Sequence, residues 1–413
     1  MLNTLCNDRT TPAFQAGLSP PSPIITAFCV LGNRMLLGKI KGIGRDLLVG
    51  ARLTLIDKPN GGSRPIRIEC ACRRSFSAAA CKVAMLTIGP HLRSLQLGGG
   101  LSHGAGIGTR MVGLFLQCEG FSVMSVDIEN AFNSTRHRVI YDSLRLYYPS
   151  LTPFFSFKYE HPSSMRNNAG ITVASTCTGV GQGDPWGSLF FELAIQPSLL
   201  RIQEALKTIE IEMDLHIPGR KGIVITSEDH TSAMGDTRAI VRLAPLVEDI
   251  FAQDGFHVKV TKSTITGSDI ETIAMIDSLP DGFRLSTQGT TMLGVPIGNR
   301  EYRRQMAQRK LSNMQPSGAA LQVMGPGIAT SLLLQSINLL PLFIMSSDSN
   351  PDDIVEYARA FDARTVSTVA GILHSEVTDM LDYRCFLPPQ LGGRNVDGEG
   401  TDRPASCLLR VHQ

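Results

Sequence analysis

The sequence of 413 residues lacks the short motifs that mark several common enzyme classes. Its nine cysteines include no C-x-x-C pair, which argues against a structural zinc module and favours single buried thiols in a reducing compartment. It has no G-x-S-x-G elbow and no P-loop, and residues 103–108 lack the G-x-G-x-x-G spacing of a dinucleotide site. These absences argue against α/β-hydrolases, P-loop nucleotide hydrolases and Rossmann dehydrogenases.

Long apolar runs are also scarce. The longest, residues 328–345, is interrupted by polar residues and a proline, and predicts a buried pair of helices instead of a membrane span. The N-terminus does not show the basic-then-apolar order of a signal peptide. With an apolar content of 43%, the composition indicates a globular protein, which we expect to be intracellular and to make no membrane contact.

The net charge of +2 is nearly neutral, but its distribution is uneven. Between Arg34 and Lys82 eleven basic residues stand against three acidic ones, and residues 300–310 hold five basic residues against Glu301 alone. Two separated basic surfaces fit a protein that grips a phosphate backbone on both sides of a cleft, although each could equally be an ordinary solvated face.

The apolar pattern predicts strands mixed with helices, followed by a long helical part. Two apolar runs, 52–56 and 64–68, surround an Asn-Gly turn and predict a β-hairpin. A Gly-rich loop is expected at 98–108, a strand at 121–128 with Val123 and Asp127 on one face, and a further strand at 257–260. The residues after 301 read as helices, so the predicted fold class is α+β.

Two segments carry the pattern of a nucleotidyl-transfer site. Residues 125–133 read as an apolar strand that delivers the carboxylate of Asp127 to its end, directly before a helix. Residues 181–185, Gly-Gln-Gly-Asp-Pro, form a glycine-rich turn that carries the amide of Gln182. A two-metal site needs a carboxylate at a strand end and a segment of close backbone approach facing it. The alternative for Asp127 is a cap of the following helix.

These two segments resemble the first two core motifs of reverse transcriptases, most closely those of non-LTR retrotransposons. Other segments resemble later parts of the same family: the fingers hairpin at 58–66, the lysine of the fourth motif at Lys262, the primer grip at 293–298 and a piece beyond the thumb at 387–393. The resemblance extends over roughly residues 40–395, which is nearly the whole chain.

The third motif departs from the family pattern of an aromatic residue, any residue and two aspartates at a hairpin tip. Aligned on the flanking strands, Asp229 takes the first aspartate position and His230 the second. A slip by one residue would make Glu228 and Asp229 the acidic pair, but it would turn every side chain to the opposite face. Imidazole also suits Zn²⁺ better than Mg²⁺.

The resemblance implies a right-hand polymerase: fingers in residues 1–115, an antiparallel palm in 116–298, and a helical thumb and tail in 299–413. It implies the following roles: Asp127 and Asp229 bind two Mg²⁺ ions, for which Mn²⁺ can substitute; Lys58 and Arg64 hold the triphosphate; Phe132 gates the sugar; Gln182 and Gly183 line the nucleotide pocket; Lys262 is the general acid. Phe132 could instead be a core residue, and Lys and Arg flank many exposed hairpins.

The implied partners are an RNA template, a DNA primer or target and deoxynucleoside triphosphates, with action in the nucleus. No zinc knuckle or nuclease motif occurs, so target cleavage would need another chain or has been lost. Two alternatives stay open: a catalytically inactive, nucleic-acid-binding remnant of the same fold, and an RNA-templated RNA polymerase. The first is favoured by His230 and the second is disfavoured by Phe132.

Overall fold

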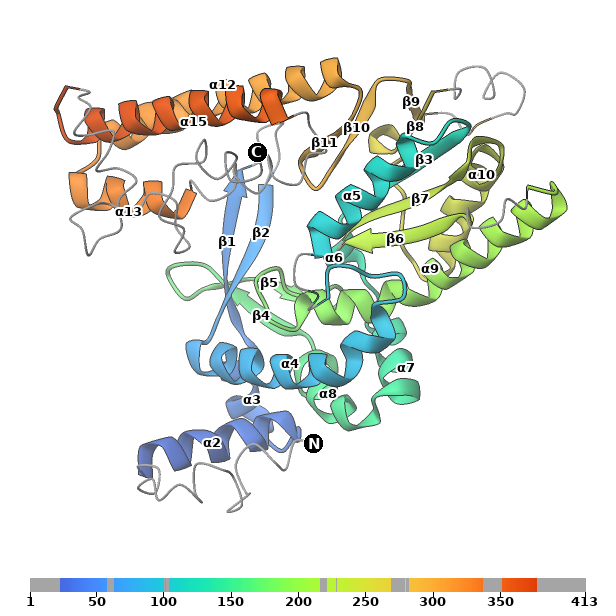
Figure 1. Cartoon of the computed structure of the whole chain (residues 1–413). Coiled ribbons are helices and arrows are strands. Elements are labelled where there is room, and N and C mark those ends of the chain that lie inside the picture. Colours follow the sequence, from blue (N-terminus) through green and yellow to red (C-terminus); the bar gives the residue numbers. More distant parts are fainter. Residues whose placement is uncertain are drawn as a thin grey trace, which may run out of the picture.

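A computed structural model describes residues 23–57, 63–99, 101, 104–215, 221–227, 229–268, 279, 282–336 and 351–376. Its centre is a five-stranded sheet with the strand order β6-β7-β3-β8-β9 (Figure 1). The strands are β3 (Phe121–Asp127), β6 (Ile223–Ser227), β7 (His230–Asp236), β8 (Thr264–Gly267) and β9 (Arg284–Ser286). All neighbours pair antiparallel except β8 and β9.

Alternation along β3 divides the core into two layers. Met124 and Val126 face the larger cluster, which is covered by α9 (Gly187–Glu212) and α10 (Thr237–Gln253). Val123 faces the second cluster, to which α5 (Gly104–Leu116) and the C-terminal helices contribute. The expected separation of these side chains onto two faces is therefore confirmed, and Asp127 lies on the side of Val123.

A second sheet, β2-β1-β4-β5, carries the predicted hairpin. Its strands are β1 (Ala51–Asp57), β2 (Ser63–Glu69), β4 (Ser163–Arg166) and β5 (Thr172–Thr176), and β1 pairs with β2 along its whole length. The sequence did not reveal β4 and β5, because four or five residues are too few for a periodic signal. In Figure 1 the hairpin points toward the C-terminal helices.

Several helices lie before and between the strands of this second sheet in the chain. They are α2 (Pro23–Leu36), α3 (Gly42–Val49), α4 (Ala71–Leu92), α6 (Ala131–Ser134), α7 (His137–Tyr147), η2 (Pro149–Leu151) and α8 (Thr152–Tyr159). Arg45 of α3 is buried and donates hydrogen bonds to the carbonyls of Phe157, Lys158 and His161. It therefore satisfies carbonyls at the end of α8 that have no partner within the helix.

The C-terminal part begins with the hairpin of β10 (Gly289–Met292) and β11 (Val295–Gly298) and continues as α12 (Arg300–Gln322), α13 (Pro326–Ser336) and α15 (Pro351–Ile372). The chain thus has a part with a hairpin, then a mostly antiparallel sheet, then helices. This confirms the predicted α+β class and is the order expected of a right-hand polymerase. The residue boundaries of the three parts stay a prediction. Within the described ranges, no helix is both long and apolar enough to cross a membrane.

Two expected elements differ in the structure. Residues 104–108 belong to α5 instead of a loop, with the α-carbons of Gly104 and Gly108 packed closely against Leu97. Residues 257–260 form a single bridge, Ile128 to Val258, instead of a strand. Pairing stops there because the chain turns into η3 (Val260–Lys262), where the Lys262 N–H donates to the Lys259 carbonyl at 2.9 Å.

Candidate functional site

Asp127 is the last residue of β3, the middle strand of the central sheet, and is half-buried. Its backbone N–H and carbonyl both form hydrogen bonds. The Lys259 N–H donates to the Asp127 carbonyl at 2.8 Å, and the Asp127 N–H donates to the Ser263 hydroxyl oxygen at 3.3 Å. The carboxylate is therefore presented by a fixed strand end and not by a helix N-terminus, since the short helix α6 begins four residues later. This geometry disfavours the alternative of a helix cap.

Lys262 lies beside this carboxylate, as its assignment to the same site requires. Its Nζ is 3.6 Å from Asp127 Oδ2, and the two side chains are 60% and 32% exposed. A partly exposed pair of this kind contributes little to folding stability. The structure thus brings Asp127 and Lys262 together from positions 135 residues apart, at a surface open to a ligand.

The β6–β7 hairpin places the third motif opposite Asp127. Ser227 pairs with His230, so the hairpin reverses between these two residues, where the preferred alignment puts its tip. On β7, His230 pairs directly with Asp127, which puts the imidazole and the carboxylate on the same face of the sheet. Asp229 lies one residue earlier in the turn, and Glu228 lies outside the described residues.

His230 is held in an environment that opposes its positive charge. Burial lowers the pKa of His230 below its usual value, although the nearby charges of Asp229 and Asp127 act in the opposite direction. Its Nε2 is buried and has no hydrogen-bond partner among the residues that the structure describes. A neutral imidazole therefore stands beside Asp127 at neutral pH, where the family pattern has a second carboxylate.

We expect the stability of the fold to decrease as the pH falls below about 6.5, the ordinary pKa of histidine. Burial lowers the pKa of both His230 and His137, so the unfolded chain binds protons that the folded chain resists. Their contribution is complete above that pH and is lost during acidification. Urea unfolding at pH 7.5, 6.5 and 5.5 measures it. His137→Gln with His230→Asn should flatten the dependence, and His257→Gln, a change at an exposed histidine, should not.

Phe132 follows Asp127 at the spacing expected of a sugar gate. Its ring is half-buried and stacks on Phe191 of α9, with 5.0 Å between the ring centroids. Its carbonyl accepts from the Val180 N–H at 2.7 Å, so the segment after Asp127 is joined to the start of the Gly-Gln-Gly-Asp-Pro turn. The structure places Phe132 between the core and the site, which is compatible with either role.

The backbone of the turn at residues 181–185 helps to fix its shape. The Asp184 N–H donates to the Gly181 carbonyl at 3.1 Å, and Gly183 adopts a positive φ of 93°, which favours glycine. Gln182 is half-buried and Gly183 is exposed, so this part of the turn is accessible. His137 reinforces the turn, because its Nε2 lies 2.8 Å from the Gly179 carbonyl.

The basic surface expected from residues 34–82 is smaller than the sequence indicates. Arg45, Arg67 and Arg73 are buried, and Arg45 and Arg73 contact protein carbonyls or carboxylates. Six of the eleven basic residues are exposed: Arg34, Lys39, Lys41, Arg52, Arg74 and Lys82. Lys58 lies outside the described residues, and Arg64 is described only as a residue of β2, so their roles toward a triphosphate stay predictions.

The carboxylates at the site are too few to enclose a magnesium ion by themselves, but they suit an ion that is also bound by substrate phosphates. Mg²⁺ keeps several waters and is commonly held by one or two carboxylates together with substrate phosphates. The site has two such carboxylates next to His230: Asp127 pairs with His230 across the sheet, and Asp229 precedes it in the chain. In the part of the chain that the structure describes, no group of three or more His, Cys, Asp or Glu residues could hold a metal.

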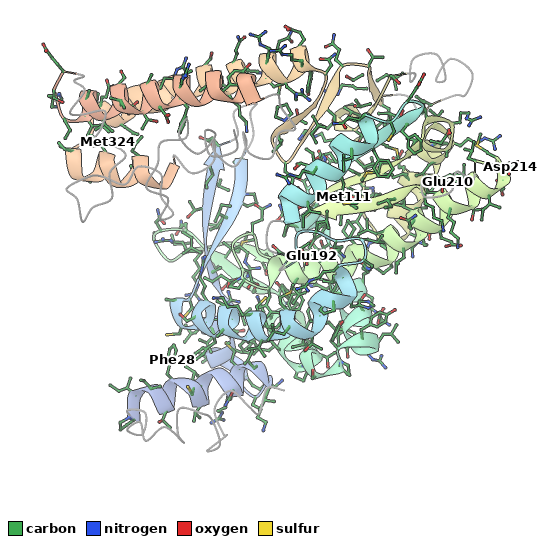
Figure 2. All side chains as sticks on the ribbon, viewed as in Figure 1. Phe28, Met111, Glu192, Glu210, Asp214 and Met324 are labelled. Atoms are coloured by element: carbon green, nitrogen blue, oxygen red, sulfur yellow. The ribbon has the colours of Figure 1, made fainter. Side chains whose placement is uncertain are left out.

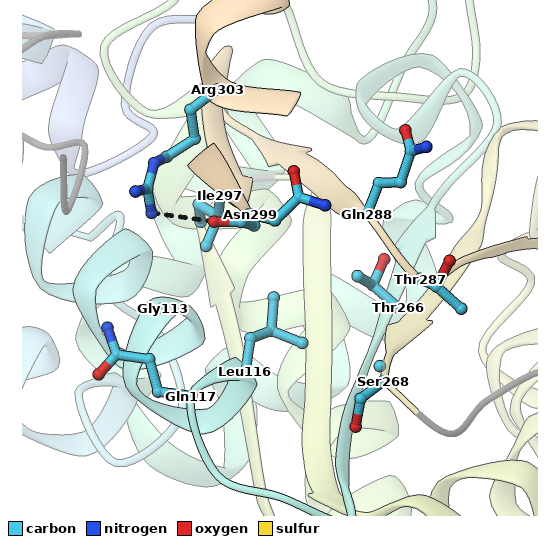
Figure 3. A pocket seen from close by; sticks show the side chains of 12 residues that line it. Gly113, Leu116, Gln117, Thr266, Ser268, Thr287, Gln288, Ile297, Asn299 and Arg303 are labelled. Carbon is cyan, nitrogen blue, oxygen red and sulfur yellow. Dashed lines mark hydrogen bonds between the residues drawn. The ribbon is translucent and has the colours of Figure 1, made fainter. Parts of the chain in front are cut away.

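A separate cavity of about 210 Å³ lies toward the opposite end of β3 (Figure 3). Its lining comes from the end of α5, from β8, from the turn before β10 and from the start of α12, and includes Gln117, Ser268, Gln288 and Arg303. Ser122 pairs with Gly267 there, five residues from Asp127 along the strand. None of the described residues assigned to the candidate site lines this cavity.

Comparison with known proteins gives structural likenesses alone. No protein-family profile and no curated sequence matches the chain. A telomerase structure from Candida albicans, in complex with a TWJ fragment of telomeric RNA, has a TM-score of 0.44 at 9% identity over 88% of this chain and 66% of the other. An apo telomerase structure from Candida tropicalis gives 0.44 and 9% over 81% and 65%. The chain thus spans just under two thirds of these proteins.

Proposed function

We propose that this chain is an RNA-directed DNA polymerase of the reverse-transcriptase type, encoded by a non-LTR retrotransposon and acting in the nucleus. The observation that carries the proposal is the convergence at one sheet edge. Asp127, Lys262 and the β6–β7 turn with Asp229 come from three distant segments and meet where β3 ends. The Gln182 turn is joined to the same segment through Phe132.

Each residue has a distinct part in this reaction. Asp127 and Asp229 would hold the Mg²⁺ ions that arrive with the nucleotide; such ions would supply activation of the primer 3′-hydroxyl and charge stabilisation of the leaving pyrophosphate. Lys58 and Arg64 hold the triphosphate, and Gln182 with Gly183 forms one wall of the nucleotide pocket. Lys262, whose Nζ lies 3.6 Å from Asp127 Oδ2, is the general acid for the leaving pyrophosphate.

Primer extension tests the proposal. The purified chain is given an RNA template, a DNA primer and deoxynucleotides in Mg²⁺ and, separately, in Mn²⁺. Extension in either metal that is lost when Asp127 or Asp229 is substituted supports the polymerase. A folded chain that binds the primer–template but extends nothing supports the inactive, nucleic-acid-binding remnant. His230 is the observation that favours this second function, because it replaces a carboxylate with a neutral, buried imidazole.

Replacing His230 by Asp should increase the rate of extension in Mg²⁺ by about 10- to 100-fold, because a carboxylate returns opposite Asp127. Steady-state rates at saturating nucleotide measure the change. His230→Asn is the matched control: it removes the imidazole without adding charge and should give no increase. An equal gain in both variants would show that the imidazole obstructs the site sterically and that the charge is irrelevant.

Replacing Phe132 by Val should weaken discrimination against ribonucleotides by roughly 10- to 100-fold if the ring contacts the sugar. The ratio of kcat/KM for a deoxynucleotide to that for the matching ribonucleotide measures this. Phe191→Leu removes the stacking partner and should lower the melting temperature with little change in the ratio. A wild-type chain that prefers ribonucleotides would instead favour the RNA-templated RNA polymerase.

A further inference from the structure

A group of buried charged side chains lies directly behind the Gln182 turn. We call Arg67, Glu69, Arg73, Lys158 and Asp184 the ionic cluster. Each is at most 7% exposed, although they come from β2, α4, α8 and the turn itself. Charged residues are rarely buried to this degree unless they are paired. In the sequence, Arg67, Glu69 and Arg73 are near one another, but Lys158 and Asp184 are distant from them.

Ion pairs connect the cluster across these segments. Glu69 at the end of β2 pairs with Arg73 in the first turn of α4, and Lys158 at the end of α8 pairs with Asp184. Arg67 donates from Nη2 to the Ser163 hydroxyl of β4 at 3.2 Å. The two pairs also act on each other. Burial lowers the pKa of Lys158, and the charges of Arg73, Glu69 and Arg67 contribute to its environment.

The Gln182 turn is seated on this cluster. Asp184 accepts from the Trp186 N–H at 3.1 Å and from the Tyr159 hydroxyl at 3.4 Å, while the Gly181 N–H donates to the Tyr159 oxygen. Burial raises the pKa of Tyr159 to about 12, so its hydroxyl stays protonated and can donate. A β-carbon on Gly181 would lie 3.3 Å from Arg67 Cδ and 3.3 Å from Asp184 Cβ.

Stability alone does not account for such a cluster. Apolar residues of similar volume often stabilise a fold as well as a buried ion pair does, because ionic groups lose hydration on burial. What the cluster provides is close contact between β2 and the turn, because the side chains of Arg67 and Glu69 both lie against Gly181. Arg67 and Glu69 occupy alternate positions of the same strand that begins with Ser63 and Arg64 at the hairpin end.

We propose that Arg67, Glu69 and Arg73 are positioning residues that set the spacing between the β1–β2 hairpin and the Gln182 turn, and thereby the affinity for the incoming nucleoside triphosphate. The inference rests on the proposed function, because it takes these two segments as opposite walls of the nucleotide pocket. The residues themselves are buried behind the walls and touch no substrate.

Nucleotide affinity and protein stability are measured separately in the test. Glu69→Gln should raise the KM for deoxynucleotides ~10-fold, with kcat and primer–template affinity within about twofold of wild type. The double variant Glu69→Gln, Arg73→Met removes both charges. It should recover much of the melting temperature that Glu69→Gln loses, while its KM for deoxynucleotides stays high. Asp254→Asn, which breaks the Arg201–Asp254 pair between α9 and α10, is the matched control and should leave the KM unchanged.

Equilibrium binding of the deoxynucleotide, with Mg²⁺ and a primer that ends in a dideoxynucleotide, repeats the comparison without chemistry. The inference is overturned if the KM and the binding constant of Glu69→Gln stay at wild-type values. It is also overturned if the KM and the binding constant of the double variant recover together with its melting temperature. A wild-type chain that binds the nucleotide but extends no primer overturns the polymerase proposal alone. A chain that binds no nucleotide overturns both.

Discussion

Replacing Asp127 by Asn should reduce primer extension by about 10³-fold or more, which corresponds to roughly 4 kcal/mol of transition-state stabilisation. The amide keeps the size of the side chain but removes the charge that Asp127 contributes at the end of β3. It also removes the ionic partner of Lys262 at 3.6 Å. Single-turnover extension on an RNA template, in Mg²⁺ and in Mn²⁺, measures the loss.

Glu129→Gln is the matched control for this change. Glu129 lies two residues beyond Asp127 at the same sheet edge and is exposed, and its carboxylate is 3.9 Å from Lys259 Nζ. The same exchange of acid for amide there should alter the rate by less than about threefold, because a surface pair of this kind contributes little. Equal losses in both variants would contradict a specific role of Asp127. Unchanged melting temperatures would separate the chemistry from folding.

Replacing Lys158 by Met should destabilise the fold by about 3–5 kcal/mol, since it leaves the buried carboxylate of Asp184 without its cation. Both side chains are almost completely buried, so water cannot replace the lost partner. The double variant Lys158→Met, Asp184→Asn should recover most of this loss, because the amide oxygen can still accept from the Trp186 N–H. Urea unfolding of the three proteins measures the differences.

An exposed ion pair provides the comparison for this prediction. Lys207 and Glu204 of α9 are 3.3 Å apart, and more than half of each side chain is exposed. Lys207→Met should therefore change the free energy of unfolding by no more than about 0.5 kcal/mol. A double variant at Lys158 and Asp184 as unstable as the single one would show that geometry and packing, and not an unpaired buried charge, cause the loss.

Features that depend on a local pattern of residues could be predicted from the sequence. The hairpin of β1 and β2 and the two faces of β3 follow from apolar periodicity and an Asn-Gly turn, which act over a few residues. The position of Asp127 at a strand end and the tight turn at Gly183 were visible for the same reason. So was the departure at His230, because it lies in a short motif.

Which distant residues meet depends on how the strands and helices pack in the folded chain. Strand register puts His230 and not Asp229 directly opposite Asp127, and it brings Lys262 within 3.6 Å of the same carboxylate. It also buries Arg45, Arg67 and Arg73, which the charge pattern had counted toward a surface. Pairing across more than a hundred residues leaves no local periodicity. The ionic cluster behind Gln182 therefore follows from the packing of β2, α4 and α8, and a sequence pattern does not contain it.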